Sequence, residues 1–398
     1  MRHSKPRRDG TVRIGLLWHS AASGNLGVGA LTLANLELVR AAAREAGLRP
    51  TFVIIGMGGE RGERYINQPD VEVFDLDGRT LLEPSGCWSL FGKLDGIIDI
   101  GAGDSFADIY GARRFFFIWW TKMLAGWRPR PLLLAPQTIG PFTRTPYRQL
   151  ASLSLSRAHA VIARDEVSLE AIKTLAPRVR RVLSADVAFA LPYEDRSALR
   201  GGPKLRLGLN VSGLLDSEAR SGRNRFQLQA DYSAMMRRCM ATLSLRDDVE
   251  IHLVSHVRSD IDGPDNDEPA AHRLAAEFPH AKLAPRFSDP IAAKSFISSL
   301  DILVAARMHA CIAAISSGVP VVSIAYSRKL VGLFGMLGYP WMVPVTGYDT
   351  DAACEYVLEC IERRAELAAD AVKAAARAQS HLDAYRGELR AFLGRIAS

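Results

Sequence analysis

The stretch ILVAARMHACIAAISSGVPVVSIAY, residues 302–326, carries the clearest sign of a fold in this chain. An apolar run ends at Arg307 and His309, an Ala-rich segment follows, and the turn Gly318-Val319-Pro320 leads into a second apolar run. Strand, helix and strand in this order are typical of a parallel βαβ unit. Such sheets bind anions and ligands just outside the carboxyl ends of their strands, where helix N-termini present N–H groups. Arg307 and His309 therefore indicate an anion site with a titratable group beside it. The structural alternative is that Arg307 pairs with a surface carboxylate and His309 caps the helix.

The same alternation continues outward in both directions. Short β-branched or Leu-rich runs alternate with longer Ala-rich helical stretches, and they predict a first set of strands at residues 12–18, 51–55, 96–100, 131–135, 160–163 and 181–183. After a loop containing Pro192, Gly201, Gly202 and Pro203, a second set is predicted at residues 205–211, 250–255, 302–305 and 321–325. Two such sets indicate an α/β protein with two Rossmann-like doubly wound domains.

The domain ranges follow from that loop. We expect an N-terminal domain over residues 11–196 and a C-terminal domain over residues 203–398, the latter ending in nearly continuous helix after Asp351. A ligand cleft is expected between the two halves. Residues 1–10, MRHSKPRRDG, carry four Arg and Lys side chains without an apolar pattern and are predicted to be a disordered basic tail.

Composition limits the class of protein. The chain has 398 residues, of which 48% are hydrophobic and 23% charged, so it is long enough to bury two sizeable cores. The apolar run that begins at Ile14 breaks at His19, too soon for a signal peptide, and a cytoplasmic protein is expected. The five cysteines are scattered and show no metal-ligand spacing, so we expect reduced core residues.

The most apolar segment is FFFIWWTKMLAGW, residues 115–127. It is shorter than the roughly 20 residues that cross a bilayer, and Thr121 and Lys122 interrupt it. Because Arg113 and Arg114 precede it, peripheral contact with an anionic membrane surface is one interpretation. A buried helix that leads into the next strand is the commoner one.

Polar residues follow the predicted strands of the first half. Asn25 lies in a Gly-rich turn that opens a helix, where backbone amides can cradle an anion, although the glycines match neither the Rossmann nor the Walker A pattern. Asp104 is a candidate acid or base, with a helix N-cap as its alternative. Gln137 offers hydrogen-bonding groups, and Arg164 is available for a phosphate or carboxylate. Asp165 and Ser168 are predicted to cap the following helix.

A further polar group follows the strand at residues 250–255. His252 and His256 lie on one face by the period of two, and Asp260, Asp262, Asp265 and Asp267 come close behind. This spacing departs from that of a calcium loop, so no structural metal is expected. His256 lies at the strand's carboxyl end, where side chains can face the expected ligand cleft.

The chain resembles the polysaccharide pyruvyl transferase family in a series of motifs. These are GNLGVGALTLAN (24–35), GAGDSFADIYG (101–111), PQTIGPF (136–142), ARDEVS (163–168), ADVAFAL (185–191) and RMHACIAAISSGVPVVSIAYSRK (307–329). Their order and spacing cover most of the chain, and PQTIGPF together with the RMH block is the discriminating pair. The resemblance implies a two-domain fold like that of glycosyltransferase-B enzymes. It also implies transfer of pyruvate from phosphoenolpyruvate to a sugar of a glycan or lipid-linked saccharide as a ketal, with release of phosphate and without a further cofactor.

The resemblance also implies roles for individual residues. Arg164 and Arg307 are expected to bind the donor, His309 to transfer a proton, and Asp104 to orient or deprotonate the acceptor. Asn25 and Lys329 are also expected to bind the donor. The alternative for Lys329 is that it is a solvated residue of a helix. Gln137 joins His256 on the acceptor side.

Two other functions compete with this one. A nucleotide-sugar glycosyltransferase of the same fold usually holds the ribose with a Glu before the Gly-x-Pro turn, roughly where this chain has Ala313. A non-catalytic glycan-binding protein would leave the simultaneous presence of Asp104, Arg164, Arg307 and His309 unexplained. Nucleic acid is not expected as a partner despite a pI of about 9.2, because the basic residues are dispersed. The oligomeric state is left open.

Overall fold

The computed structural model describes residues 10–57, 64–258 and 263–397. The chain forms two compact units. The first unit contains the chain up to Ser23, Leu31–Leu191 and the segment from Ala378 onward, and the second contains Gly24–Ala30 and Pro192–Arg377. The predicted basic tail lies almost wholly outside the described residues.

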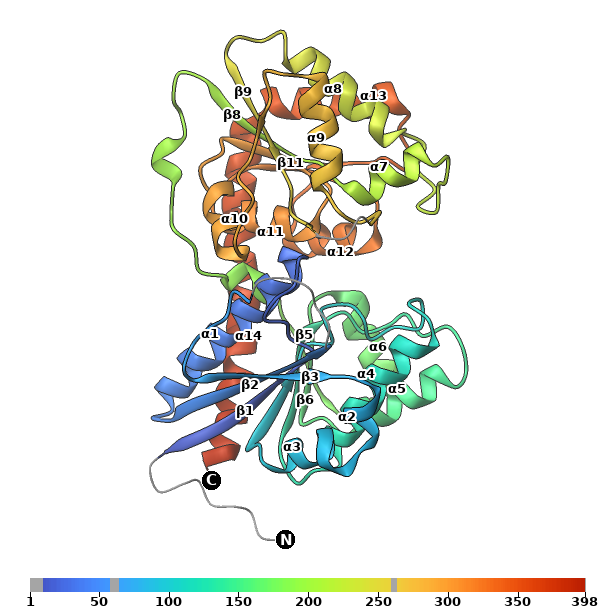
Figure 1. Ribbon diagram of the computed structural model, residues 1–398, viewed down its shortest axis with the longest axis vertical. Coiled ribbons are helices and arrows are strands. Elements are labelled where there is room, and N and C mark those ends of the chain that lie inside the picture. The colour runs from blue at the N-terminus through green and yellow to red at the C-terminus, as the bar shows by residue number, and fades with distance from the viewer. Residues whose placement is uncertain (1–9, 58–63, 259–262, 398) are drawn as a thin grey trace. The chain divides into compact units, whose positions relative to one another are not determined.

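The first unit is built on a parallel sheet of seven strands (Figure 1). Its strand order is β3-β2-β1-β4-β5-β6-β7, with β1 (Thr11–Leu17), β2 (Arg49–Met57), β3 (Val71–Leu76), β4 (Gly96–Asp99), β5 (Leu132–Gln137), β6 (Ala160–Ala163) and β7 (Arg180–Leu183). The strand order reverses between β1 and β4, which makes their carboxyl ends the switch point where doubly wound sheets bind ligands.

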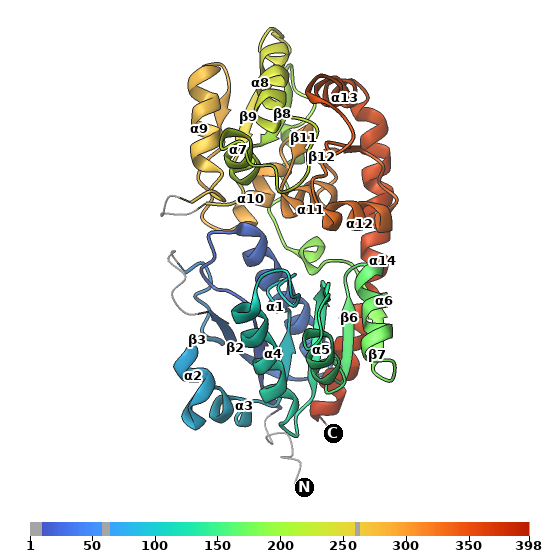
Figure 2. The ribbon, with the colours of Figure 1, turned by 90° about the vertical axis from the view of Figure 1, so that its right-hand side faces the viewer.

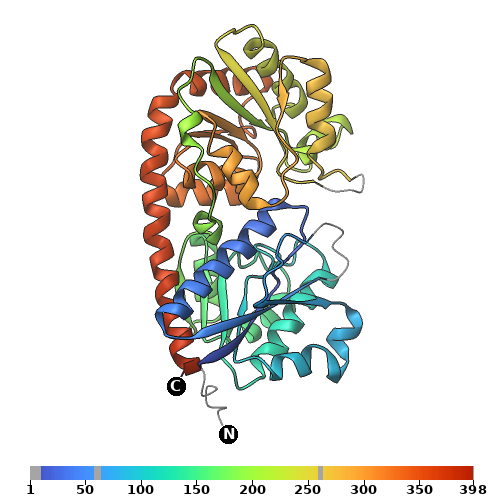
Figure 3. The ribbon, with the colours of Figure 1, turned by 60° about the vertical axis from the view of Figure 1, so that its left-hand side comes forward.

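Helices cover both faces of this sheet. One face carries α4 (Ala112–Gly126), α5 (Tyr147–Leu155) and α6 (Glu166–Leu175), and the short elements α2 (Gly78–Leu82), η1 (Pro84–Trp88), α3 (Ser89–Gly92) and η2 (Val187–Ala190) complete the unit. Figure 3 shows α1 (Leu26–Glu45) crossing the other face, beside the last helix, α14 (Arg364–Ala397). The buried Tyr385 of α14 donates a hydrogen bond to Asn35 of α1 at 2.7 Å.

The second unit repeats the arrangement with six parallel strands. Their order is β10-β9-β8-β11-β12-β13, with β8 (Leu205–Asn210), β9 (Val249–Val254), β10 (Lys282–Leu283), β11 (Ile302–Ala305), β12 (Val321–Ile324) and β13 (Met342–Val343). The helical elements are η3 (Ser197–Leu199), α7 (Gly213–Arg220), α8 (Tyr232–Leu243), α9 (Glu268–Glu277), α10 (Pro290–Ile297), α11 (Met308–Ser316), α12 (Arg328–Leu337) and α13 (Thr350–Glu362). Here the switch point lies between β8 and β11.

The predicted α/β class and the two doubly wound sheets are confirmed. Each of the ten predicted runs is a strand, and two of them, at residues 160–163 and 302–305, have the predicted ends. The prediction missed β3, β10 and β13, which all lie at the edge of a sheet. β10 and β13 are two residues long and β3 is mostly half-exposed, so none of them shows the apolar run that marks a buried strand.

The compact units differ from the predicted ranges at the domain boundary, because residues 192–196 group with the second unit, and in two further segments. Gly24–Ala30 groups with the second unit, and the chain from Ala378 groups with the first. The reason for the last difference lies in α14, which runs unbroken past Arg377. Its buried stripe continues at helical spacing through Leu382, Tyr385, Leu389 and Phe392, and this part packs within the first unit.

The five cysteines are free and buried, as predicted. Among the described residues, α1 is long and apolar enough to cross a membrane by length and composition, but 72% of its apolar window is buried in the protein. That burial identifies α1 as a core helix.

Candidate functional site

Polar side chains gather at the carboxyl ends of the strands in each unit. The first-unit cluster consists of Asp99, Lys122, Gln137, Arg164 and Asp186, which follow or face β4 to β7. The second-unit cluster consists of Asn25, Gly27, His256, Asp267, Arg307 and His309. Six of the eight site residues predicted from the sequence belong to one cluster or the other, and Asp104 and Lys329 belong to neither.

A buried ion pair forms the base of the first-unit cluster. The Lys122 Nζ of α4 lies 2.6 Å from the Asp99 Oδ2 at the end of β4, and both side chains are fully buried. Burial raises the pKa of Asp99 and lowers that of Lys122, and each charge opposes the shift of the other. The other Asp99 oxygen accepts the Gly101 N–H at 2.7 Å. The pair thus fixes the start of the turn that carries Asp104.

Gln137 ends β5 beside this pair. Its Nε2 donates to the Asp99 carbonyl at 2.8 Å, and its side chain is fully buried. Its Oε1 has no hydrogen-bond partner among the described residues and faces Gly101, where an added Cβ would lie 2.2 Å from that oxygen. Gly101 also has a positive φ of 56°, so this close approach requires glycine.

Arg164 follows β6 and is paired with a carboxylate. Its NH1 donates to Asp186 at 2.8 Å within a buried ion pair, and its Nε donates to the Thr138 hydroxyl at 2.9 Å. The predicted cap is confirmed for Asp165, whose side chain accepts the Ser168 N–H at the start of α6, but it is wrong for Ser168, whose hydroxyl accepts the Ile139 N–H at 3.0 Å. Asp186 belongs to the ADVAFAL motif, but the sequence prediction assigned it no role.

Asp104 lies in a turn rather than at a helix start. It is half-buried and accepts a hydrogen bond from the Tyr110 hydroxyl at 2.6 Å. The next helix, α4, begins eight residues later, with Gly111 as its N-cap. The capping alternative for Asp104 is therefore wrong, and the carboxylate remains a candidate for chemistry.

The second-unit cluster is centred on Arg307, at the junction of β11 and α11. Its Nε and NH2 donate to Asp267 Oδ1 at 3.1 and 2.7 Å, and its NH1 donates to Asp265 Oδ1 at 2.8 Å. Arg307 is buried; burial by itself would lower its pKa, but the charges of Asp267 and Asp265 raise it above its ordinary value. The Arg307 guanidinium thus already forms ion pairs with two carboxylates.

Asp267 connects three strand ends. Its Oδ2 accepts the backbone N–H groups of His256 and Val257 after β9, and its Oδ1 accepts the Gly213 N–H after β8. The side chain of Asn210, the last residue of β8, accepts the backbone N–H of Arg307 at 3.0 Å. The carboxyl ends of β8, β9 and β11 therefore converge on one buried carboxylate.

The Gly-rich segment at the start of α1 packs against His309. A Cβ built on Gly27 would lie 2.2 Å from His309 Nδ1, and one on Gly24 would lie 2.2 Å from the Arg258 carbonyl oxygen. Asn25 accepts the Gly27 N–H through its side chain, and its backbone pairs with Val257. These two glycines therefore serve close packing.

His256 and Lys329 complete the second unit's predicted residues. His256 is buried, and its burial, together with the charges of His309 and Arg307, lowers its pKa to about 3. It is therefore neutral near pH 7. Lys329, in the first turn of α12, is half-buried, and burial lowers its pKa to about 8. His252, which lies within β9, does not join the cluster and pairs with Glu250 at 2.7 Å instead.

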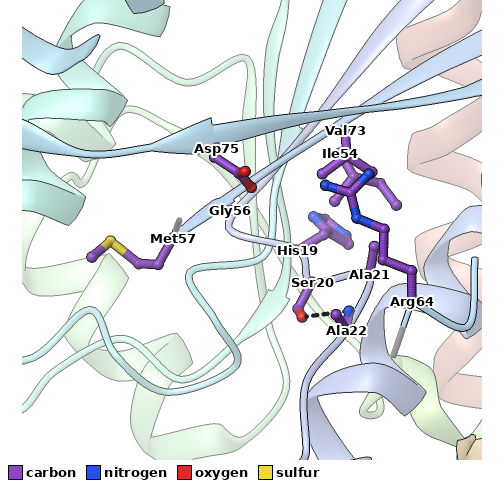
Figure 4. Close-up of a pocket in the computed structure, with 10 residues that line it drawn as sticks. All are labelled: His19, Ser20, Ala21, Ala22, Ile54, Gly56, Met57, Arg64, Val73 and Asp75. Carbon is purple, nitrogen blue, oxygen red and sulfur yellow. Dashed lines mark hydrogen bonds between the residues drawn. The ribbon is translucent and has the colours of Figure 1, made fainter. Parts of the chain in front are cut away.

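A pocket of about 70 Å³ opens at the carboxyl ends of β1, β2 and β3 (Figure 4). Arg64 and Asp75 lie on either side of His19 there. Burial lowers the pKa of His19 to about 4, and its two ring nitrogens contact the Leu17 carbonyl at 3.0 Å and the Asn35 amide at 2.9 Å. The sequence prediction did not include this pocket, and the only sequence signal was the break of the first strand at His19.

His, Cys, Asp and Glu are the side chains that could hold a metal ion in the described part of the chain. No group of three or more His, Cys, Asp or Glu side chains is arranged there to hold a metal ion. Asp260 and Asp262 lie outside the described residues, whereas Asp265 and Asp267 serve as the ion-pair partners of Arg307.

Comparison with solved structures defines the class of fold. The chain is similar to a proposed UDP-N-acetylglucosamine 2-epimerase from Listeria monocytogenes, with a TM-score of 0.57, 14% identity and coverage of 95% of this chain and 94% of that one. It is also similar to Anabaena HepE in complex with UDP and glucose, with a TM-score of 0.54, 13% identity and coverage of 96% and 98%. The fold is therefore that of the two-domain glycosyltransferase-B type.

The particular family follows from the sequence comparisons. The sequence model of the polysaccharide pyruvyl transferase family matches residues 34–328, and the chain belongs to this family of transferases. A curated relative, the amylovoran biosynthesis protein AmsJ of Erwinia amylovora, is 22% identical over 271 residues. That match covers 63% of this chain and 61% of the length of AmsJ.

Proposed function

We propose that this protein transfers pyruvate from phosphoenolpyruvate to two hydroxyl groups of a saccharide as a cyclic ketal, with release of phosphate. Family membership supports pyruvyl transfer, and the name of AmsJ connects a relative with polysaccharide biosynthesis. The observation that carries the proposal is the second-unit cluster, in which His309 occupies the first turn of α11, two residues after Arg307, and packs against Gly27.

The reaction needs one group that moves protons. Protonation of the methylene carbon of phosphoenolpyruvate creates a positive centre at C2, which the first sugar hydroxyl attacks as it loses its proton. The C2–O bond to phosphate then breaks, and the second hydroxyl closes the ketal. Of the two hydroxyl protons, one balances the proton added to the methylene carbon and the other leaves with phosphate. We assign the transfer to His309, because an imidazole gives and takes protons near neutral pH.

The donor also needs positive charge for its phosphate and carboxylate. The N-terminus of α11 supplies N–H groups and a positive dipole end, and the half-buried Lys329 supplies an ammonium group. Arg307 is engaged by two carboxylates, so the donor binds beside this ion pair or replaces Asp265, whose side chain is 55% exposed. We retain Arg164 and Asn25 as donor-site proposals.

On the acceptor side, we propose that Asp104 orients or deprotonates the sugar. Gln137 and His256 are 0% and 4% exposed, which favours a positioning role over direct sugar contact for both. Gln137 would hold the turn before Asp104 through its bond to the Asp99 carbonyl, and His256 would support His309.

The test is release of phosphate from phosphoenolpyruvate in the presence of saccharides that carry free neighbouring hydroxyl pairs. We expect His309→Ala to lower turnover by about 10²-fold or more, the usual contribution of a positioned acid or base, while phosphoenolpyruvate still binds by calorimetry. Asp104→Asn should chiefly impair use of the acceptor. His280→Ala, which removes an exposed histidine outside the cluster, is the matched control and should be unchanged.

Each outcome bears on a different part of the proposal. Near-normal turnover of His309→Ala would reduce that residue to a packing role against Gly27. Consumption of a nucleotide sugar instead of phosphoenolpyruvate would favour a glycosyltransferase, although the chain has the buried Ala313 where such enzymes usually place a Glu.

A further inference from the structure

A long stretch of the first unit carries positive charge and no negative charge. Residues 109–164 contain eight arginines and one lysine, and no Asp or Glu. The whole chain has a formal net charge of only +7, so its other parts sum to a negative value. Lys122 and Arg164 are buried in ion pairs, and the remaining seven, Arg113, Arg114, Arg128, Arg130, Arg144, Arg148 and Arg157, are exposed or half-buried.

This stretch includes α4 and α5, which lie side by side on one face of the first sheet (Figure 2). Their outer surface, the α4–α5 face, carries a row of contacting aromatic rings. Consecutive ring centroids along the row are 6.1, 6.1, 5.8 and 5.4 Å apart, in the order Tyr147, Phe116, Trp119, Trp120 and Trp127. Phe116 and Trp127 are 41% and 43% exposed.

The polar edges of two of these rings point into the protein. The Trp119 indole donates to the Leu150 carbonyl at 2.9 Å, and the Trp120 indole donates to the Leu81 carbonyl at 3.2 Å. Because their indole N–H groups donate to carbonyl groups of the protein, the parts of these rings that are exposed to solvent are carbon atoms. Aromatic side chains with one apolar end exposed are suited to the boundary between lipid and water.

A basic cavity adjoins the Trp127 end of the row. It has a volume of about 440 Å³ and is lined by Arg130, Arg157, His159 and Arg395, with Asp95 as the single carboxylate among the described lining residues. Asp95 already accepts the Arg13 backbone N–H at 2.8 Å. Arg157 belongs to both features, because its guanidinium also lies 5.7 Å from the centre of the Trp127 ring. Cations and apolar rings therefore share one surface.

We propose that the α4–α5 face docks on an anionic membrane surface. Phe116 and Trp127 enter the lipid–water boundary, and the basic cavity receives a lipid phosphate. The charge excludes a second copy of this chain as the occupant, because a symmetric contact would bring the seven arginines against the same seven arginines. Asp104 and Asp108 lie before the N-terminus of α4, away from Trp127 at its other end, and both accept hydrogen bonds from protein groups.

The test is flotation of the protein with vesicles of phosphatidylcholine alone and with vesicles that contain equal amounts of phosphatidylglycerol. We expect binding to the anionic vesicles only, weakened by salt. A cation close to such a surface strengthens binding about fivefold, so Arg130→Glu with Arg157→Glu should lower the partition coefficient by about 25-fold or more. Trp127→Ser should also lower it without a change in charge.

Matched controls separate this surface from general effects. Arg220→Glu with Arg223→Glu makes the same change in net charge at two exposed arginines of the second unit, and it is the control for the arginine pair. Leu245→Ser replaces an apolar side chain that is 87% exposed, and it is the control for Trp127→Ser. Both should bind as the unchanged protein does, and all variants should keep its thermal unfolding midpoint. Equal binding to neutral vesicles, or equal loss in the control pair, would overturn the proposal. Equally tight binding to a DNA oligonucleotide, lost in the same variants, would assign the face to nucleic acid instead.

Discussion

At the scale of single residues, the candidate site depends on Gly27, which has no side chain. Because Gly27 has no Cβ, the His309 imidazole can lie against its backbone, in the space that a Cβ of residue 27 would otherwise need. The two residues thus pack together although they are far apart in the chain. The Asn25 side chain holds this turn by accepting the Gly27 N–H at 3.0 Å. The orientation of His309 is therefore set by the first turn of α1 as well as by its own helix.

Gly27→Ala tests this packing. The new methyl group would lie 2.2 Å from His309 Nδ1, so the imidazole or the turn must move. We expect a loss of about 1–3 kcal/mol in the free energy of unfolding, typical of overpacking, and a loss of turnover because small displacements of a reacting group are costly. Gly332→Ala in α12, where an added Cβ would have no neighbour within 4 Å, is the control and should leave turnover unchanged. Normal turnover of Gly27→Ala would show that catalysis does not depend on the position of the His309 imidazole.

At the scale of elements, one carboxylate holds the carboxyl ends of three strands in the second unit. Asp267 is fully buried and is bonded to Arg307 before α11, to the backbone after β9 and to the backbone after β8. Asp265 engages the same guanidinium, but its side chain is 55% exposed. The two carboxylates thus contact one arginine in very different surroundings.

Asp267→Asn and Asp265→Asn form a matched pair. Asp267→Asn removes the buried negative charge that balances the Arg307 guanidinium, and it weakens the hydrogen bonds that Asp267 accepts from the backbone. The free energy of unfolding should therefore fall by about 3–5 kcal/mol. The exposed partner is screened by solvent, and its loss should cost about 1 kcal/mol or less. Urea unfolding at pH 7 measures both. Equal effects would show that Asp267 does not organise these strand ends.

At the scale of the whole molecule, each unit contains one buried histidine with a strongly lowered pKa. His19 in the first unit has a pKa of about 4 and His256 in the second has one of about 3, in both cases chiefly because of burial. Both are neutral in the folded protein near pH 7. The unfolded chain binds protons at these positions below about pH 6.5, whereas the folded chain does not.

The protein should therefore lose stability on acidification. Because the unfolded state binds more protons between pH 6.5 and the folded pKa values, the free energy of unfolding falls as pH falls through this window. By pH 5 each histidine should account for about 2 kcal/mol of the loss. Urea unfolding at pH 7 and pH 5 measures it, and His19→Gln and His256→Gln should each reduce the difference. The exposed His280→Gln is the control, and an unchanged difference in the first two variants would contradict the assignment.

The core strands could be predicted from the sequence because their signals are local. Each of the ten predicted strands is a short apolar run bounded by turn residues, and the two sets of runs are separated by a loop rich in Gly and Pro. The edge strands could not be predicted in this way, since β10 and β13 consist of two residues each. The N-cap role of Asp165 was also predictable, because its partner Ser168 is three residues away.

The sequence by itself determined the α/β class, the two doubly wound domains and the family, since all three depend on runs and motifs of neighbouring residues. Only the tertiary structure decided the partners of the candidate residues. Arg307 pairs with Asp267, Arg164 with Asp186, and His309 packs on Gly27, and none of these pairs is adjacent in the chain. Such pairs form because parallel strands bring their carboxyl ends to one edge of a sheet, and the order of the strands decides which ends are neighbours.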